Sequence, residues 1–145
     1  NAAQLARALG FRSLKPFFAG RGGEFIGVQT ALARPMPRSQ LAERLARVLG
    51  APPVVLPGGS DICRRIGICT GGAGSELAQA RREGVDTFIT GEGPHWSYTL
   101  AEELGINLIY GGHYATETFG VRALSEEISR KFRIPHTFLD HPTGL

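Results

Sequence analysis

Two side chains near the end of the chain have the types and the spacing to bind a metal ion. His113 follows two glycines, and Glu117 comes four residues later. If residues 113–117 form the first turn of a helix, these two positions lie on one face, with Cβ atoms about 6 Å apart. An imidazole nitrogen and a carboxylate could then share one metal ion or a close pair of ions. Glutamate is also ordinary in a first helical turn, and a metal site needs three or more ligands, so the spacing alone leaves both interpretations open.

A second candidate for chemistry is Glu92, which lies between two glycines in T-G-E-G-P-H (residues 90–95), directly after an apolar run. A carboxylate at such a turn is a solvated loop residue, a general base within reach of a water molecule, or a group that orients a ligand. We take Glu92 as the candidate catalytic residue for proton transfer. The neighbouring His95 is equally ambiguous.

A third glycine-rich stretch, T-G-G-A-G-S (residues 70–75), precedes a predicted helix. Free backbone N–H groups at a helix start can bind a phosphate or a carboxylate. The stretch lacks the third glycine of the dinucleotide fingerprint and the lysine of a P-loop. The alternative is a tight turn in which Ser75 caps the helix. The candidate residues for binding an anionic substrate group are Gly71, Gly72, Gly74 and Ser75.

Repeated strand–turn–helix units position these three stretches. Nearly all-apolar strands are predicted at 64–70, 85–90 and 106–110, with helices at 76–83, 96–104 and 115–131. This pattern indicates an α/β fold with a largely parallel sheet and helices on both faces. Turns that follow parallel strands lie at the carboxyl edge of the sheet, where ligands bind. Side chains on the three turns are therefore predicted to converge; they are Ser75, Glu92, His95 and His113.

The remaining segments are predicted from their hydrophobic periodicity and their turn residues. An amphipathic helix is expected at residues 38–49, with Ser39 as its N-cap. Helix 115–131 carries an apolar face that includes Val121, Leu124 and Ile128. The other expected elements are a helix at 1–10, strands at 13–20 and 24–33 around the turn 20–23, a short strand at 53–56 and a last strand at 134–140.

Length and composition indicate a soluble globular protein with a single domain, residues 1–145. No apolar run approaches the ~20 residues needed to span a bilayer. The net charge of +3 is spread along the chain rather than clustered with aromatic residues, so nucleic-acid binding is not expected. Cys63 and Cys69 are not at the spacing of a zinc knuckle. Cys69 lies in an apolar run, so we expect a reduced core cysteine, as suits a cytoplasmic protein.

At G-G-H-Y-A-T-E the chain resembles the NIF-three (Ngg-one-interacting-factor-three-like) family, whose members are often named GTP cyclohydrolase I type 2 homologues. The matching stretches are I-C-T-G-G-A-G-S-E-L, G-V-D-T-F-I-T-G-E, G-G-H-Y-A-T-E and G-V-R-A-L-S-E-E. The resemblance is to the carboxyl-terminal 60% or so of the family, and a member of about 240–250 residues would have about 100 more residues than this chain. The chain is therefore expected to be a fragment.

The resemblance implies a centre of two divalent metal ions, with His113 and Glu117 as ligands and Glu117 bridging the ions. The family's other ligands are a pair of histidines and an aspartate, and no residue of this chain matches them. Nitrogen and oxygen ligands suit Zn, Fe, Mn, Co or Ni, and the sequence does not distinguish among them.

The resemblance also implies two intertwined α/β repeats assembled as a homohexamer. The implied function is a metal-dependent hydrolase acting on a small nucleotide-like or heterocyclic substrate. The alternative is a non-enzymatic metal-binding scaffold, or a regulatory protein that acts through protein partners.

Overall fold

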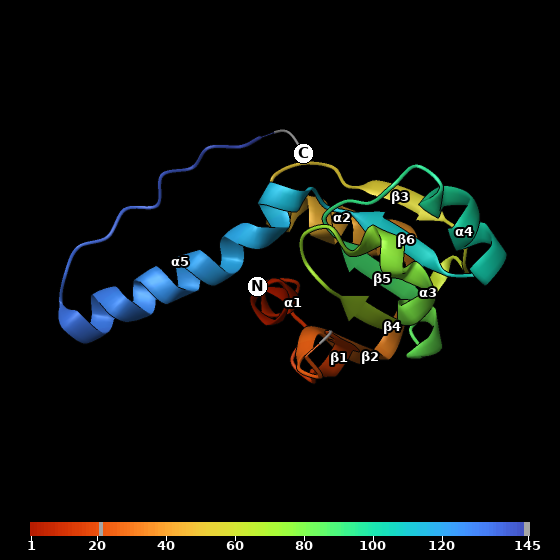
Figure 1. Ribbon diagram of the computed structural model, residues 1–145, viewed down its shortest axis with the longest axis horizontal. Coiled ribbons are helices and arrows are strands. Elements are labelled where there is room, and N and C mark those ends of the chain that lie inside the picture. Colours follow the sequence, from red (N-terminus) through yellow and green to blue (C-terminus); the bar gives the residue numbers. More distant parts are fainter. Residues whose placement is uncertain (21, 144–145) are drawn as a thin grey trace.

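A computed structural model describes residues 1–20 and 22–143, and these residues form a six-stranded sheet packed between helices (Figure 1). The strands are β1 (Lys15–Ala19), β2 (Phe25–Pro37), β3 (Val54–Pro57), β4 (Ile62–Ile68), β5 (Thr87–Thr90) and β6 (Asn107–Tyr110). The helices are α1 (Ala2–Ala8), α2 (Arg38–Leu49), the 3-10 helix η1 (Ala73–Glu76), α3 (Leu77–Arg82), α4 (Ser97–Leu104) and α5 (His113–Phe132). The expected turn 20–23 includes residue 21, which lies outside the described residues.

The sheet is mixed, which corrects the prediction of a largely parallel sheet. The strand order is β1-β2-β4-β5-β6-β3. Among the strands of the described residues, only the central β4, β5 and β6 are parallel to one another. The pairs β1–β2, β2–β4 and β3–β6 are antiparallel. The predicted β-α units are therefore present, but they account for only the centre of the sheet.

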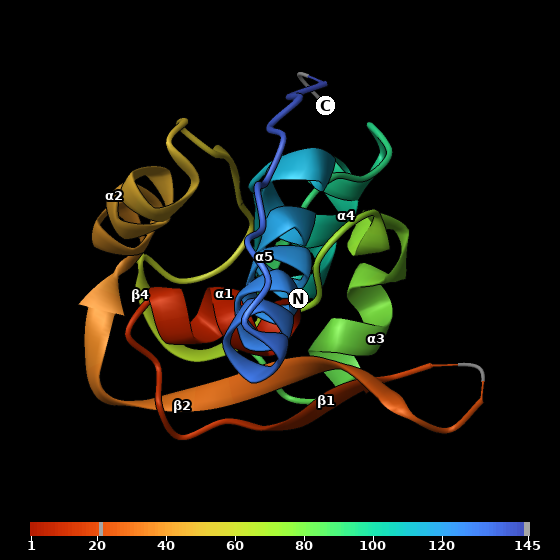
Figure 2. The same cartoon turned by 90° about the vertical axis from the view of Figure 1, so that its left-hand side faces the viewer.

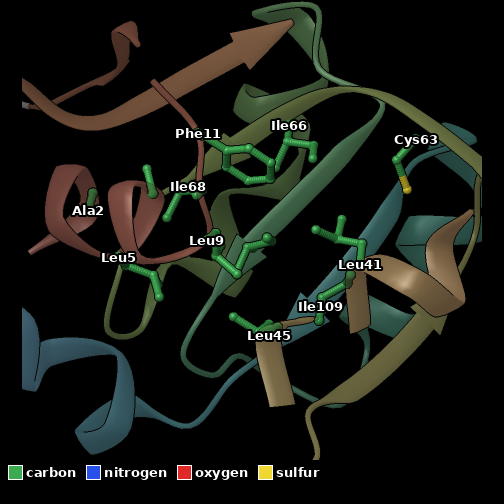
Figure 3. Packing of buried hydrophobic residues seen from close by; sticks show 12 residues of the cluster. Ala2, Leu5, Leu9, Phe11, Leu41, Leu45, Cys63, Ile66, Ile68 and Ile109 are labelled. Atoms are coloured by element: carbon green, nitrogen blue, oxygen red, sulfur yellow. The ribbon is translucent and has the colours of Figure 1, made fainter. Parts of the chain in front are cut away.

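Helices cover both faces of the sheet, as predicted (Figure 2). They form a hydrophobic core with each face. On one face, α1 and α2 pack against isoleucines of the central strands; Figure 3 shows Leu5, Leu41, Leu45, Ile66 and Ile109 in this cluster. On the other face, α3 and α4 pack over a cluster of aromatic and aliphatic side chains, among them Phe17, Phe88 and Leu108. The central strands are buried on both sides, which explains why their sequences are nearly all apolar.

Helix α2 has the predicted span, but its predicted cap is wrong. The helix begins at Arg38, so Ser39 lies inside it and its side chain makes no capping hydrogen bond. Pro37 precedes the helix with an extended backbone. Leu41 and Leu45 are buried at a spacing of four, and Gly50 ends the helix in the left-handed conformation that glycine adopts without strain.

The C-terminal part of the chain differs most from the prediction. Residues 134–140, expected to be the last strand, form no strand. Instead this segment runs back beside α5, where Arg122 lies over the ring of Phe138 and the hydroxyl of Tyr114 donates a hydrogen bond to Asp140. Helix α5 itself projects away from the sheet for much of its length (Figure 1). None of the helices in the described part of the chain is long and apolar enough to cross a membrane.

Both cysteines are free and buried, which confirms the prediction for Cys69. Burial raises the pKa of the Cys69 thiol to about 11, and the charges of Glu76 and Glu117 act in the same direction. Only the thiolate is reactive, so at a pH of about 8 nearly all of this thiol is protonated and inert. We expect a colorimetric thiol reagent to titrate no cysteine in the folded protein and both after unfolding in urea. Rapid reaction of a thiol in the folded protein would contradict this burial.

Candidate metal centre

The three glycine-rich turns meet at the carboxyl edge of the parallel strands, as predicted. Backbone hydrogen bonds, as well as side chains, join the three turns. The N–H groups of Gly91 and Glu92 both donate to the carbonyl of Gly71, at 2.8 and 3.0 Å. The N–H of Gly112 donates to the carbonyl of Gly91 at 2.9 Å, and that of Gly74 donates to the carbonyl of Glu92 at 3.1 Å. The turn at 90–95 is therefore held between the other two.

Glycine is required where these turns touch. A Cβ atom on Gly91 would lie 2.6 Å from the oxygen of Gly71 and 2.7 Å from the Cα of His113. Real Cβ atoms essentially never come this close to backbone atoms. The absence of a side chain at Gly91 is thus what allows the second and third turns to approach each other.

Two buried threonines, which the sequence analysis did not single out, fix the same turns. The Thr90 hydroxyl donates to the carbonyl of Gly71 and accepts from the N–H of Ala73. The Thr116 hydroxyl accepts from the N–H of Gly71. Each threonine adjoins a glycine-rich turn, one at the end of β5 and one in the first turn of α5. That position was the only signal for them in the sequence.

The turns bring three candidate side chains into contact. His113 Nδ1 lies 2.7 Å from Glu92 Oε1, and His113 Nε2 lies 3.3 Å from Glu117 Oε2. The three side chains are each a little under half exposed, at 43%, 48% and 45% for His113, Glu92 and Glu117. The imidazole therefore lies between two carboxylates that remain open to solvent on one side.

Electrostatics at this cluster favour a cation. The hydrogen bond to Glu92 is the largest effect on the pKa of His113 and raises it; burial opposes this shift, and the charge of Glu117 raises the pKa further. The cluster borders a cavity of about 560 Å³, which is also lined by Val121, Phe138 and Leu139. Glu92 also borders a second cavity of about 880 Å³, a volume in the usual range for small-molecule sites.

Ser75 and His95 were predicted to converge with Glu92 and His113, but in the described part of the chain they make no contact with these side chains. Ser75 is exposed, and its hydroxyl donates to the carboxylate of Glu76 at 2.6 Å. It therefore does not cap α3, which begins after Glu76. His95 is exposed on the turn that carries Glu92. The chemistry of this edge thus rests on Glu92, His113 and Glu117.

The anion-binding hypothesis for the first turn gains little support. The N–H groups of Gly71 and Gly74 are already bonded, to Thr116 and to the carbonyl of Glu92. Gly72 remains at the surface of the turn, beside His113 and Glu92. Binding of an anion by Gly71, Gly72, Gly74 and Ser75 stays a prediction.

The donor set fits half of a metal site. Two ligand atoms that each lie about 2.1 Å from one ion are about 3.0–3.4 Å apart when the ligand–metal–ligand angle is between the octahedral and the tetrahedral value. The distance of 3.3 Å between His113 Nε2 and Glu117 Oε2 falls in this range. Glu92 holds the other ring nitrogen, as second carboxylates do for metal-binding histidines. A Cβ on Gly71 would lie 3.0 Å from Glu117 Oε1 and 3.3 Å from His113 Nε2, so its absence keeps the space beside both donors open.

Two donors do not complete a site. Within residues 1–20 and 22–143, no group of three or more His, Cys, Asp or Glu side chains could hold a metal ion. Glu92 does not count as a third ligand because it faces Nδ1 of His113, on the opposite side of the ring from Nε2. A metal ion would therefore need at least one further ligand from elsewhere.

Comparison with sequence families matches residues 1–143 to Duf34/NIF3 (NGG1p interacting factor 3). The chain belongs to the Duf34/NIF3 family. The resemblance seen at G-G-H-Y-A-T-E is thereby confirmed. A protein from Deinococcus radiodurans named GTP cyclohydrolase 1 type 2 homolog is 41% identical over 145 residues, which are all of this chain and 55% of the relative. A Halobacterium salinarum protein of the same name is 40% identical over 148 residues, covering all of this chain and 58% of the relative.

Solved structures show the same fold for this Duf34/NIF3 chain. The protein ybgI, described as of unknown function, has a TM-score of 0.87 at 35% identity and covers 98% of this chain and 56% of its own. The protein TTHA1606 from Thermus thermophilus has a TM-score of 0.79 at 37% identity, over 97% of this chain and 54% of its own. The chain therefore spans little more than half the length of the relatives that it matches.

Proposed function

We propose that this Duf34/NIF3 chain carries one half of a dinuclear metal centre in a metal-dependent hydrolase. The observation that supports this most is the arrangement of His113, with Nδ1 held by Glu92 and Nε2 directed at Glu117. The name GTP cyclohydrolase 1 type 2 homolog, borne by relatives, points to a nucleotide or a related heterocycle as substrate.

The residues of this chain have distinct roles in the proposed reaction. His113 Nε2 and the carboxylate of Glu117 would hold divalent metal, which supplies Lewis acidity and lowers the pKa of a bound water. Glu92 would keep the imidazole oriented by accepting a hydrogen bond from Nδ1, and it is our candidate for accepting a proton from the nucleophile. The 560 Å³ cavity, which is lined by Glu92, His113 and Glu117, is large enough for a heterocyclic substrate.

Replacement of His113 tests this function. In the metal-binding form of the protein, we expect His113→Ala to abolish both metal binding and the hydrolysis of GTP or a related heterocycle. Metal analysis and product formation measure the two losses. His136→Ala is the matched control, because His136 is an exposed histidine on the C-terminal segment. Turnover that His113→Ala leaves unchanged would exclude this site as the centre of the reaction.

A second candidate function is a non-enzymatic metal-binding scaffold that acts through protein partners. The observation that favours it is the exposed apolar surface of α5, where Leu124 and Phe132 are about 60% exposed. We further propose that the protein assembles with copies of itself, as a hexamer. If chelation of the metal breaks up the assembly while no substrate is turned over, the scaffold is the better account.

A further inference from the structure

Tyr110 is the last residue of β6 and directly precedes the third glycine-rich turn. Its side chain is partly buried and packs against the core formed with α3 and α4. Its hydroxyl reaches the other two turns, because this oxygen is the nearest atom to a Cβ placed on Gly74 or on Gly93, and either Cβ would clash with it. A side chain that belongs to the third turn therefore fills the place where the first and second turns meet.

The hydroxyl of Tyr110 takes part in a hydrogen-bond chain whose direction can be assigned. Ser97, the first residue of α4, is fully buried, and its Oγ lies 2.6 Å from the carbonyl oxygen of Pro94 and 2.6 Å from the Tyr110 hydroxyl. A carbonyl only accepts, so the single hydroxyl proton of Ser97 is donated to Pro94, and Tyr110 must donate its own proton to Ser97. Burial raises the pKa of Tyr110, so this proton stays in place at neutral pH. The chain thus runs from Tyr110 through Ser97 to Pro94.

This chain ends in the turn that carries Glu92. Backbone hydrogen bonds tie the N–H and the carbonyl of Glu92 to the first turn. The next residue is Gly93, and glycine has the greatest backbone freedom of any residue. Tyr110 limits that freedom twice, because its oxygen occupies the space beside Gly93 and its hydrogen-bond chain holds Pro94. The backbone on both sides of Glu92 is therefore restrained.

We propose that Tyr110 is a positioning residue for Glu92. Acting through Ser97 and Pro94, its hydroxyl holds the second turn where Glu92 Oε1 lies 2.7 Å from His113 Nδ1. A consequence for metal binding rests on the proposed function, whereas the effect on the contact between Glu92 and His113 does not.

Phenylalanine at position 110 would separate positioning from folding. The ring would still pack against its core, and Ser97 would still donate to Pro94, so the fold should persist. The oxygen beside Gly93 and the first hydrogen bond of the chain would be lost. The second turn could then move, and Glu92 would make its contact with His113 for only part of the time.

Cobalt titration of the metal-binding form of the protein tests the consequence for the metal. We expect Tyr110→Phe and Ser97→Ala each to weaken Co²⁺ binding by about three- to tenfold, less than the loss of the Glu92 carboxylate itself. Tyr98→Phe is the matched control, because it removes the hydroxyl of an exposed tyrosine next to Ser97, and it should change binding less than about twofold.

A double-mutant cycle distinguishes positioning from a general loosening of the site. In protein that already carries Glu92→Ala, we expect Tyr110→Phe to change Co²⁺ binding less than about twofold, because the side chain through which Tyr110 acts is gone. A merely structural role would give the same loss of affinity with and without Glu92. Equal losses in the two proteins would therefore overturn the proposal.

The metal-free protein gives a readout that does not depend on the proposed function. At a fixed pH, the nitrogen NMR signal of His113 Nδ1 reports whether Glu92 accepts its hydrogen bond. We expect Tyr110→Phe to move this signal toward its position in Glu92→Ala, and Tyr98→Phe to leave it in place. An unmoved signal in Tyr110→Phe would overturn the positioning role. A moved signal in protein that binds no Co²⁺ would support the positioning role and overturn the metal-dependent function.

Discussion

Gly91→Ala should destabilise the protein by about 3 kcal/mol, the upper end of the range for overpacked sites. The new Cβ would lie 2.6 Å from the oxygen of Gly71, 2.7 Å from the Cα of His113 and 2.9 Å from the oxygen of Gly112. All three are backbone atoms, so no side-chain rotation can relieve the contact. The turns must separate, and the 2.7 Å contact between Glu92 and His113 should be lost with them. Urea unfolding measures the loss of stability.

The matched control is Gly72→Ala, in the adjoining turn. The nearest atoms to a Cβ at Gly72 are 3.7 Å away, which is an ordinary contact, and its φ of −103° suits any residue. We expect a change in the free energy of unfolding below about 0.5 kcal/mol. Similar losses of stability for the two variants would mean that the turns do not pack as described.

Glu92→Ala should lower the metal affinity of the metal-binding form of the protein by about 10- to 100-fold, the usual effect of losing a carboxylate that orients a metal-binding histidine. The reason is the 2.7 Å contact that fixes the ring of His113 with Nε2 toward Glu117. Glu92→Gln retains an oxygen that can accept the Nδ1 proton, so it should keep more of the affinity than alanine does. Metal titration of the three proteins measures the order.

The same two variants separate the two roles considered for Glu92. If Glu92 transfers a proton, Glu92→Gln should abolish turnover while metal affinity falls only slightly, because an amide cannot act as a base. If Glu92 only orients His113, turnover should follow metal occupancy in both variants. Affinity that neither substitution changes would show that the contact with His113 does not support the site.

The centre of the sheet and the convergence of the turns could be predicted from the sequence. Three apolar runs, each followed by glycines and a helix, have few arrangements other than parallel strands with their turns at one edge. The outer strands could not be assigned a direction in this way. The run P-V-V-L of β3 is short and apolar in either orientation, and its antiparallel pairing with β6 depends on the path of the chain after α2. The strand expected at 134–140 has a suitable pattern, but a pattern does not supply a neighbouring strand.

Within the candidate site, the sequence placed Glu92, His113 and Glu117 together, but it also included Ser75 and His95, which do not join them. It did not show how the side chains bond. The spacing of His113 and Glu117 predicted one helical face, and the structure places their donor atoms 3.3 Å apart. The bond from Glu92 to the other ring nitrogen joins residues 21 positions apart, and no local pattern encodes it. Thr90 and Thr116, which support the turns, could not be found in the sequence either. A buried hydroxyl that bonds to a neighbouring turn leaves no periodic pattern in the sequence.

All three turns of the candidate centre, and every side chain placed in it, come from the continuous stretch between β4 and the first turns of α5. The hairpin β1–β2 and the loop between α2 and β3 lie outside this stretch. Homologues should therefore accept insertions and deletions in that hairpin, while the spacing from residue 70 to residue 117 stays almost constant. The positions at which homologues differ in length, and not residue identity alone, would then show which part of the molecule the chemistry depends on.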